Sequence, residues 1–178
     1  MNLLKHFAAD SVRHVQALGL LQGGRFATRI LGERHPSSGD LLPWQIRTLE
    51  SLQSVICAGD SDDLPTPDEC GALEATLGFM RGMPTPTVER MSALLALFEA
   101  APLAMGPVRV RFSALDPAQQ NAFLESWPDS RLPQQRAAFH AIKTMCMMGY
   151  WTRPSTWGPI GYDIKSNPGV PDHLREGI

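Results

Sequence analysis

Along most of the chain, apolar residues recur at steps of three and four, which is the spacing of one face of an α-helix. The pattern predicts one amphipathic helix over residues 3–21 and another over residues 43–56. The apolar stripe of the first comprises Leu3, Leu4, Phe7, Ala8, Val12, Val15 and Leu18. The stripe of the second comprises Trp44, Ile46, Leu49, Leu52, Val55 and Ile56.

Prolines in first-turn positions mark where further helices begin, because the N–H that a proline lacks has no partner there anyway. These signals predict helices over residues 66–80, 85–101, 116–126 and 132–148. Residues 108–112 alternate apolar and basic, but no second strand pattern exists to pair with them, so an extended connector is expected. The sequence therefore predicts an all-α fold of about six helices in a single compact domain.

Composition divides the chain into three parts. Residues 1–40 are expected to form the N-terminal amphipathic helix and a loop, residues 41–164 the helical domain, and residues 165–178 a polar tail. The helical domain should end in an irregular segment after Gly149, since glycine and proline alternate there with large aromatic side chains. That segment holds both tyrosines and two of the four tryptophans of the chain.

Charge and length exclude several classes of protein. A net charge of −2 argues against a nucleic-acid-binding protein, which needs a basic face to follow phosphates. No window holds eighteen uninterrupted apolar residues, so no transmembrane segment is expected. Charged residues interrupt the N-terminal stretch before the apolar region of a signal peptide could form, and no twin-arginine pair lies near the start, so a cytoplasmic location is expected.

No residue pattern predicts an autonomous active site. The histidines are scattered without ligand spacing, and Cys57, Cys70 and Cys146 form no CxxC pair, although a single bridge between two of them stays open. The phosphate-binding, dinucleotide-binding and nucleophile-elbow motifs are absent from the sequence. We therefore expect no catalytic residue and no metal or cofactor bound by this chain. Arg109 and Arg111 suit either contact with an acidic partner or a plain exposed edge.

The aromatic segment is the strongest candidate for a functional surface. It is too broken by glycine and proline to be helical, yet it carries too much apolar area to lie free in water. It either folds back over the helices or presents aromatic anchors to a partner, and Trp and Tyr dominate interface hot spots. The candidate partner-binding residues are Tyr150, Trp151, Trp157, Ile160, Gly161 and Tyr162.

The C-terminal half also carries a recognisable order of residues: Leu115-Asp116-Pro117, Gln120, Phe123-Leu124, Trp127, Ser130, Arg136, Phe139, Lys143, Tyr150, Pro154, Trp157 and Ile160-Gly161-Tyr162. In this order the chain resembles the gluconate 2-dehydrogenase subunit 3 family, and the segment from Trp44 to Pro65 is similar to that family's opening helix and acidic turn more loosely. The resemblance covers residues 41–170, about two-thirds of the chain.

The resemblance implies a small helical accessory subunit that binds a larger flavoprotein of the glucose–methanol–choline (GMC) type, in which the large subunit carries FAD and the substrate pocket. The small subunit of that family supports folding, stability or export of its partner and has no assigned catalytic residues. Residues 1–40 depart from exported members, which carry a twin-arginine signal, so a cytoplasmic stabilising role is expected. Two rival hypotheses are a self-contained helical binding protein or homodimer, and an enzyme or metalloprotein that uses the histidines and Cys146.

Overall fold

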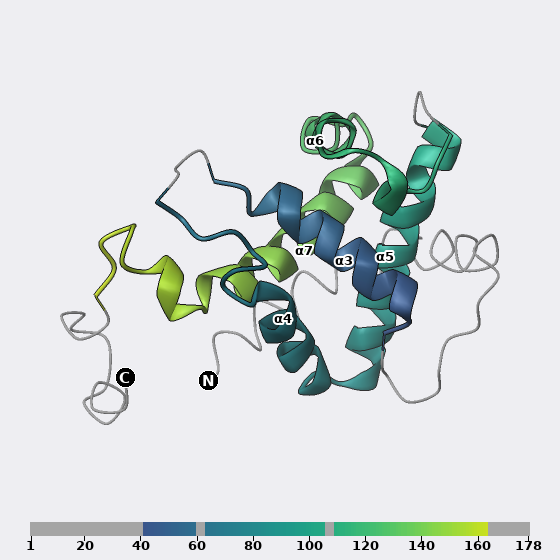
Figure 1. Ribbon diagram of the computed structural model, residues 1–178. Helices are drawn as coiled ribbons and strands as arrows, with labels where there is room; N and C mark the ends of the chain where they lie inside the picture. Colours follow the sequence, from purple (N-terminus) through teal and green to yellow (C-terminus); the bar gives the residue numbers. More distant parts are fainter. Residues whose placement is uncertain (1–40, 60–62, 106–108, 164–178) are drawn as a thin grey trace.

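A computed structural model describes residues 41–59, 63–105 and 109–163 of the 178 (Figure 1). Within these ranges the chain is helical and contains no strand. The elements are α3 (Pro43–Ile56), α4 (Ala72–Arg81), α5 (Thr85–Met105), the 3-10 turn η1 (Phe112–Ala114), α6 (Pro117–Glu125), α7 (Pro133–Trp151) and the 3-10 turn η2 (Pro154–Thr156). The predicted all-α fold is confirmed. The helix expected over residues 3–21 and the tail over residues 165–178 lie outside the described residues.

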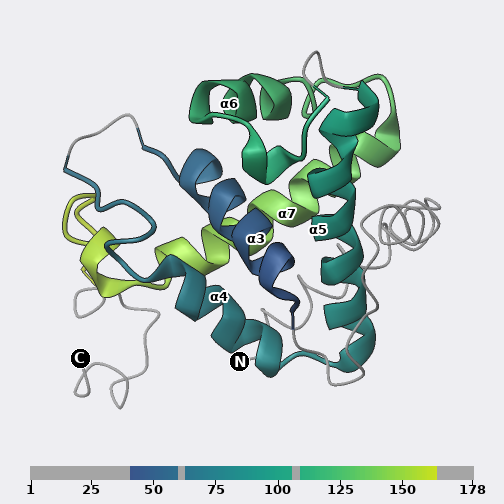
Figure 2. The ribbon, with the colours of Figure 1, turned by 45° about the vertical axis from the view of Figure 1, so that its right-hand side comes forward.

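Helix α3 lies at the centre of the described fold and contacts α4, α5, α6 and α7 (Figures 1 and 2). The buried part of its predicted stripe explains this position, because Trp44, Leu49 and Leu52 are all nearly inaccessible to solvent. Apolar side chains from α5 and α7 meet α3 in one main core, which includes Leu95, Phe98 and Ile142. Burial of such aliphatic and aromatic side chains supplies most of the driving force for folding.

Helix α5 differs from the simple amphipathic pattern because residues on nearly all of its sides are buried, including Glu99. The Glu99 carboxylate accepts hydrogen bonds from the Thr48 hydroxyl at 3.0 Å, the Ser113 hydroxyl at 2.7 Å and the Ser113 N–H at 3.1 Å. A buried carboxylate is tolerated only when its oxygens are satisfied in this way. Glu99 thereby connects α3 and α5 to the residues of η1.

The start of α4 differs from the prediction. Thr66 and Glu69 form the expected cap, in which the Glu69 carboxylate accepts hydrogen bonds from the Thr66 N–H and hydroxyl, both at 2.8 Å. Gly71 then adopts a φ of +68°, a left-handed conformation that ends this first turn, and α4 begins at Ala72 instead of at residue 66. Glycine adopts that conformation without the steric cost that a Cβ would bring.

The end of α7 also differs, because the helix continues through Gly149 and Tyr150 to Trp151 and does not stop at residue 148. Gly149 lies where α7 crosses α4: a Cβ at residue 149 would lie 1.9 Å from the Thr76 hydroxyl oxygen and 2.7 Å from the Ala72 carbonyl oxygen. The glycine permits a close approach of the two helices and does not terminate α7.

Two other predicted features agree with the structure. Residues 109–111 form a connector without a strand, and Asp116 caps α6 by accepting a hydrogen bond from the Gln119 N–H at 2.8 Å.

Candidate partner-binding surface

Two hydrogen bonds attach the C-terminal end of α7 to the loop that precedes α4. The Tyr150 hydroxyl donates to the Pro65 carbonyl oxygen at 2.7 Å, and the Arg153 side chain donates from Nε to the Cys70 carbonyl oxygen at 2.6 Å. Tyr150 is only 1% exposed, and burial raises the pKa of its phenol above the ordinary value. Of the six candidate residues from the sequence, Tyr150 therefore packs inside the fold.

Beyond this attachment, the remaining aromatic side chains hold one another on the outside of the helical body. The Trp151 indole N–H donates to the Met147 sulfur at 3.2 Å, and the Trp157 indole N–H donates to the Trp151 carbonyl oxygen at 2.8 Å. The rings of Trp157 and Tyr162 meet edge to face, with centroids 5.6 Å apart. These contacts give the aromatic rings fixed positions although they lie at the surface.

A tight turn directs the end of this segment outward. Gly161 has a φ of +69°, and its N–H donates to the Gly158 carbonyl oxygen at 3.0 Å. The Tyr162 N–H closes the same turn on the Trp157 carbonyl oxygen at 2.9 Å. Because Gly161 takes the left-handed conformation, the chain reverses here and leaves Ile160 and Tyr162 on the outside.

Four large apolar side chains are exposed in the part of the chain that the structure describes, and three of them belong to this segment. Trp151 is 37% exposed, Tyr162 41% and Ile160 52%, whereas the fourth, Leu132, lies at the other end of α7. We call Trp151, Trp157, Ile160 and Tyr162 the aromatic surface. Exposed aromatic side chains in ordered positions are typical of interface anchors, so partner contact stays the prediction for these residues.

A groove next to the aromatic surface was missed by the sequence analysis. It has a volume of about 580 Å³ and runs along the exposed side of α7. The residues that line it are His140, Lys143, Thr144, Met147, Met148, Trp151 and Thr152. The signal was present as a stripe of residues at steps of four, but the expected helix end at residue 148 cut that stripe short of Trp151.

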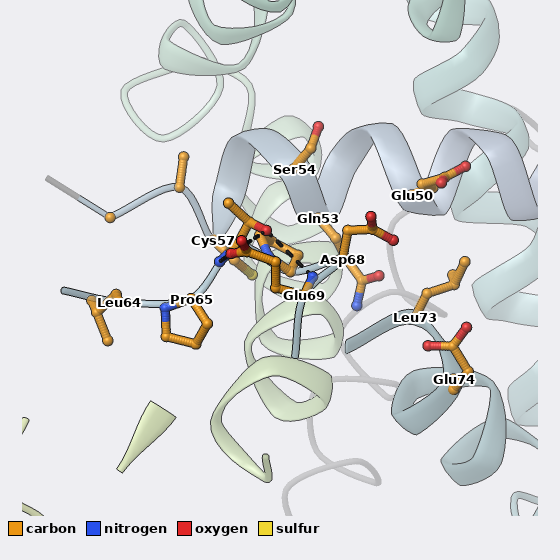
Figure 3. Close-up of a pocket in the computed structure, with 14 residues that line it drawn as sticks. Glu50, Gln53, Ser54, Cys57, Leu64, Pro65, Asp68, Glu69, Leu73 and Glu74 are labelled. Carbon is orange, nitrogen blue, oxygen red and sulfur yellow. Dashed lines mark hydrogen bonds between the residues drawn. The ribbon is translucent and has the colours of Figure 1, made fainter. Parts of the chain in front are cut away.

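A second cavity, of about 750 Å³, lies between the end of α3, the loop that precedes α4 and the start of α4 (Figure 3). The carboxylates of Glu50, Asp68, Glu69 and Glu74 line it. Hydrogen bonds from the backbone N–H and the hydroxyl of Thr66 lower the pKa of Glu69. Among the described residues that line this cavity, none is a lysine, arginine or histidine, so their ionisable side chains are mainly carboxylates.

The thiols are poorly suited to act as nucleophiles. Cys57, Cys70 and Cys146 are buried free cysteines, so no disulfide joins them. Burial, together with the neighbouring Cys70, raises the pKa of the Cys57 thiol to about 12, and burial raises that of Cys146 well above its usual range. A thiol reacts as the thiolate, so at neutral pH these groups act as small apolar side chains.

Two other features, a metal site and a membrane span, are absent from the described residues. Within them, no group of three or more histidine, cysteine, aspartate or glutamate side chains is placed to hold a metal ion. Among the same residues, no helix combines the length and the apolar character that crossing a membrane requires.

Comparison of the sequence with known proteins identifies the family to which the chain belongs. No curated protein and no solved structure matches the chain. A family model does: gluconate 2-dehydrogenase subunit 3 matches residues 43–163, about two-thirds of the chain. The match runs from the start of α3 through the turn that closes at Tyr162, so it includes both the helical core and the aromatic surface. The chain therefore belongs to the gluconate 2-dehydrogenase subunit 3 family, which implies that it is a component of a dehydrogenase complex.

Proposed function

We propose that this chain is a non-catalytic small subunit that binds and stabilises a larger FAD-dependent dehydrogenase of the GMC type, and that this larger dehydrogenase acts on an alcohol or a sugar. The observation that carries the proposal is the ordered aromatic surface within the region that matches the family. On this proposal the FAD and the substrate pocket belong to the large subunit. The small subunit contributes a rigid helical body and a docking surface.

The aromatic surface suits a stable heteromer. Each large aromatic side chain can bury about 150–250 Å², and obligate interfaces bury on the order of 2,000 Å² or more. Trp151 and Trp157 are already held by hydrogen bonds to neighbouring atoms of the same segment. Binding such pre-ordered side chains costs less conformational entropy than ordering them on contact, which favours affinity.

The chemistry of the described interior supports a non-catalytic role. Its most buried potential acids and nucleophiles have internal roles, since the Glu99 carboxylate accepts three hydrogen bonds and the Tyr150 hydroxyl donates to a backbone carbonyl. The thiols are held in the protonated form by burial. Stabilisation of the partner then follows by mass action, because a subunit that binds only the folded partner shifts its folding equilibrium.

Co-expression with a GMC-type flavoprotein encoded beside this chain tests the proposal. We expect the two chains to co-elute in size-exclusion chromatography at micromolar concentration, with one complex that carries flavin absorbance. The flavoprotein expressed alone should melt at a lower temperature or appear mainly in the insoluble fraction. Separate elution of the two chains would refute the proposal, and elution of this chain as a dimer of itself would favour the homodimer hypothesis.

A further inference from the structure

The groove on α7 has the form of a helix-docking site. Its lining residues fall into two rows at steps of four along one helix: His140, Thr144, Met148 and Thr152 in one row, and Lys143, Met147 and Trp151 in the other. Side chains at steps of four form ridges on a helix, and a second helix packs by placing a ridge of its own between two such rows. From His140 to Thr152 the groove is about 18 Å long, or roughly three helical turns.

The floor and the rim of the groove restrict what can occupy it. The half-buried Met147 and Met148 and the exposed Trp151 provide an apolar floor, and methionine adapts well to a partner's shape. Among the described residues that line the groove, the ionisable side chains are Lys143 and His140, and none carries a carboxylate. A complementary occupant therefore carries an apolar ridge with a carboxylate placed opposite Lys143.

The sequence outside the described residues fits this requirement poorly. In residues 1–40, five lysines and arginines outnumber three aspartates and glutamates, so that segment has a net charge of the same sign as the rim. In residues 164–178, Pro168 and Pro171 interrupt any helical pattern. A helix of the partner subunit that carries an apolar ridge and a carboxylate is the occupant that these requirements describe.

We propose that the α7 groove seats a helix of the large flavoprotein subunit, with Trp151 as the apolar anchor and Lys143 paired to a carboxylate on that helix. This inference rests on the proposed function and specifies which surface of the chain performs it. It also extends the aromatic surface into one continuous interface, because Trp151 belongs both to the groove and to that surface.

Site-specific photo-crosslinking in the co-expressed complex tests the proposal. A photoreactive p-benzoylphenylalanine at Thr144, in the middle of the groove, should give an adduct with the large subunit, and peptide mapping should place the crosslink in a helix near an acidic residue. The same group at Leu132, which is exposed at the start of α7 outside the groove, serves as the matched control and should give little adduct. An adduct confined to residues 1–40 or 164–178 of the same chain, or to a second copy, would overturn the proposal.

Affinity measurements on variants provide a second readout. Trp151→Ala should weaken the complex at least about 30-fold, the scale of an interface hot spot. Lys143→Glu should weaken it about 10-fold or more, because like charges would then face each other, whereas Arg47→Glu on α3 should have little effect. If a flavin-containing complex forms but tolerates Trp151→Ala and Lys143→Glu and gives no Thr144 adduct, the groove assignment fails and the proposed function stands. If no complex forms, both fail.

Discussion

Gly149→Ala should be among the most destabilising single-methyl additions in this fold, because it inserts a Cβ where α7 crosses α4. The new atom would lie 1.9 Å from the Thr76 hydroxyl oxygen, 2.7 Å from the Ala72 carbonyl oxygen and 3.1 Å from the Gln53 side-chain nitrogen. The Ala72 oxygen is part of the backbone of α4, so it can move only if the helix moves. Thr76 is itself held, since its hydroxyl donates to the Ala72 carbonyl at 3.0 Å.

The magnitude follows from opposing contributions. Alanine improves helix propensity over glycine by about 1 kcal/mol. Overpacking costs about 1–3 kcal/mol. Displacement of Thr76 breaks the hydrogen bond that Gln53 donates to it at 2.8 Å, which costs about 0.5–1.5 kcal/mol, since Gln53 also donates to the Ala72 carbonyl oxygen at 3.2 Å. The net loss in the free energy of unfolding should be about 0.5–3.5 kcal/mol, which for a chain of this length corresponds to a fall of about 1–14 °C in Tm.

Thermal and urea denaturation, followed by circular dichroism, measure this loss. Gly78→Ala is the matched control, because Gly78 lies in α4 and a Cβ added there would meet no atom within 4 Å. This control should leave stability unchanged or raise it by up to about 1 kcal/mol. Adding Thr76→Ala to Gly149→Ala should recover part of the loss, since it removes the atom in closest conflict. If Gly149→Ala melts at or above the temperature of the unmodified protein, the close crossing is wrong.

Four further predictions concern the end of α7, the turn after it and the Cys57 thiol. Tyr150→Phe should lower the free energy of unfolding by about 1–2 kcal/mol in urea denaturation, because it removes the hydroxyl that satisfies the Pro65 carbonyl; an unchanged midpoint would contradict this role. Tyr162→Ala should weaken partner binding by roughly 30-fold with little change in Tm, since the side chain is 41% exposed; an equal loss in Tm would show that it serves the fold instead. Cys57, with a pKa of about 12, should resist alkylation at pH 8 until the protein unfolds. Because its folded pKa is raised above the ordinary value of 9.0, its contribution to stability should be present below pH 9 and disappear as the pH rises towards 12, which urea denaturation across that range would detect.

Local patterns were sufficient for much of the fold. The periodic stripe of α3 and the proline-led start of α6 predicted their elements because both depend on neighbours within a few residues. Gly71 and Gly149 were misjudged for the same reason. The left-handed conformation of Gly71 separates the capped first turn from α4. Gly149 has the sequence context of a helix end, but it allows the close approach of α7 to residues of α4 that lie more than seventy positions earlier. Contacts of that sequence separation leave no periodic signal.

The candidate partner-binding surface shows the same difference between features that depend on neighbouring residues and features that depend on long-range contacts. Aromatic enrichment indicated the segment as a candidate surface, but it could not separate the buried Tyr150 from the exposed Trp151 next to it, since that depends on which side of α7 faces α4. Once α7 is extended to Trp151, its rows at steps of four become continuous and the groove follows from them. The groove could have been found from sequence only if the helix had been expected to continue through a glycine.

The two hydrogen bonds that attach Tyr150 and Arg153 to the loop before α4 make the aromatic surface and the acidic cavity parts of one mechanical unit. Pro65 lines that cavity and accepts the hydrogen bond from Tyr150, so a shift of the loop at Pro65 acts directly on the end of α7. A partner that holds the aromatic rings in place therefore also slows opening of the loop around Thr66 and Cys70. In hydrogen–deuterium exchange, the amides of that loop should become protected on complex formation.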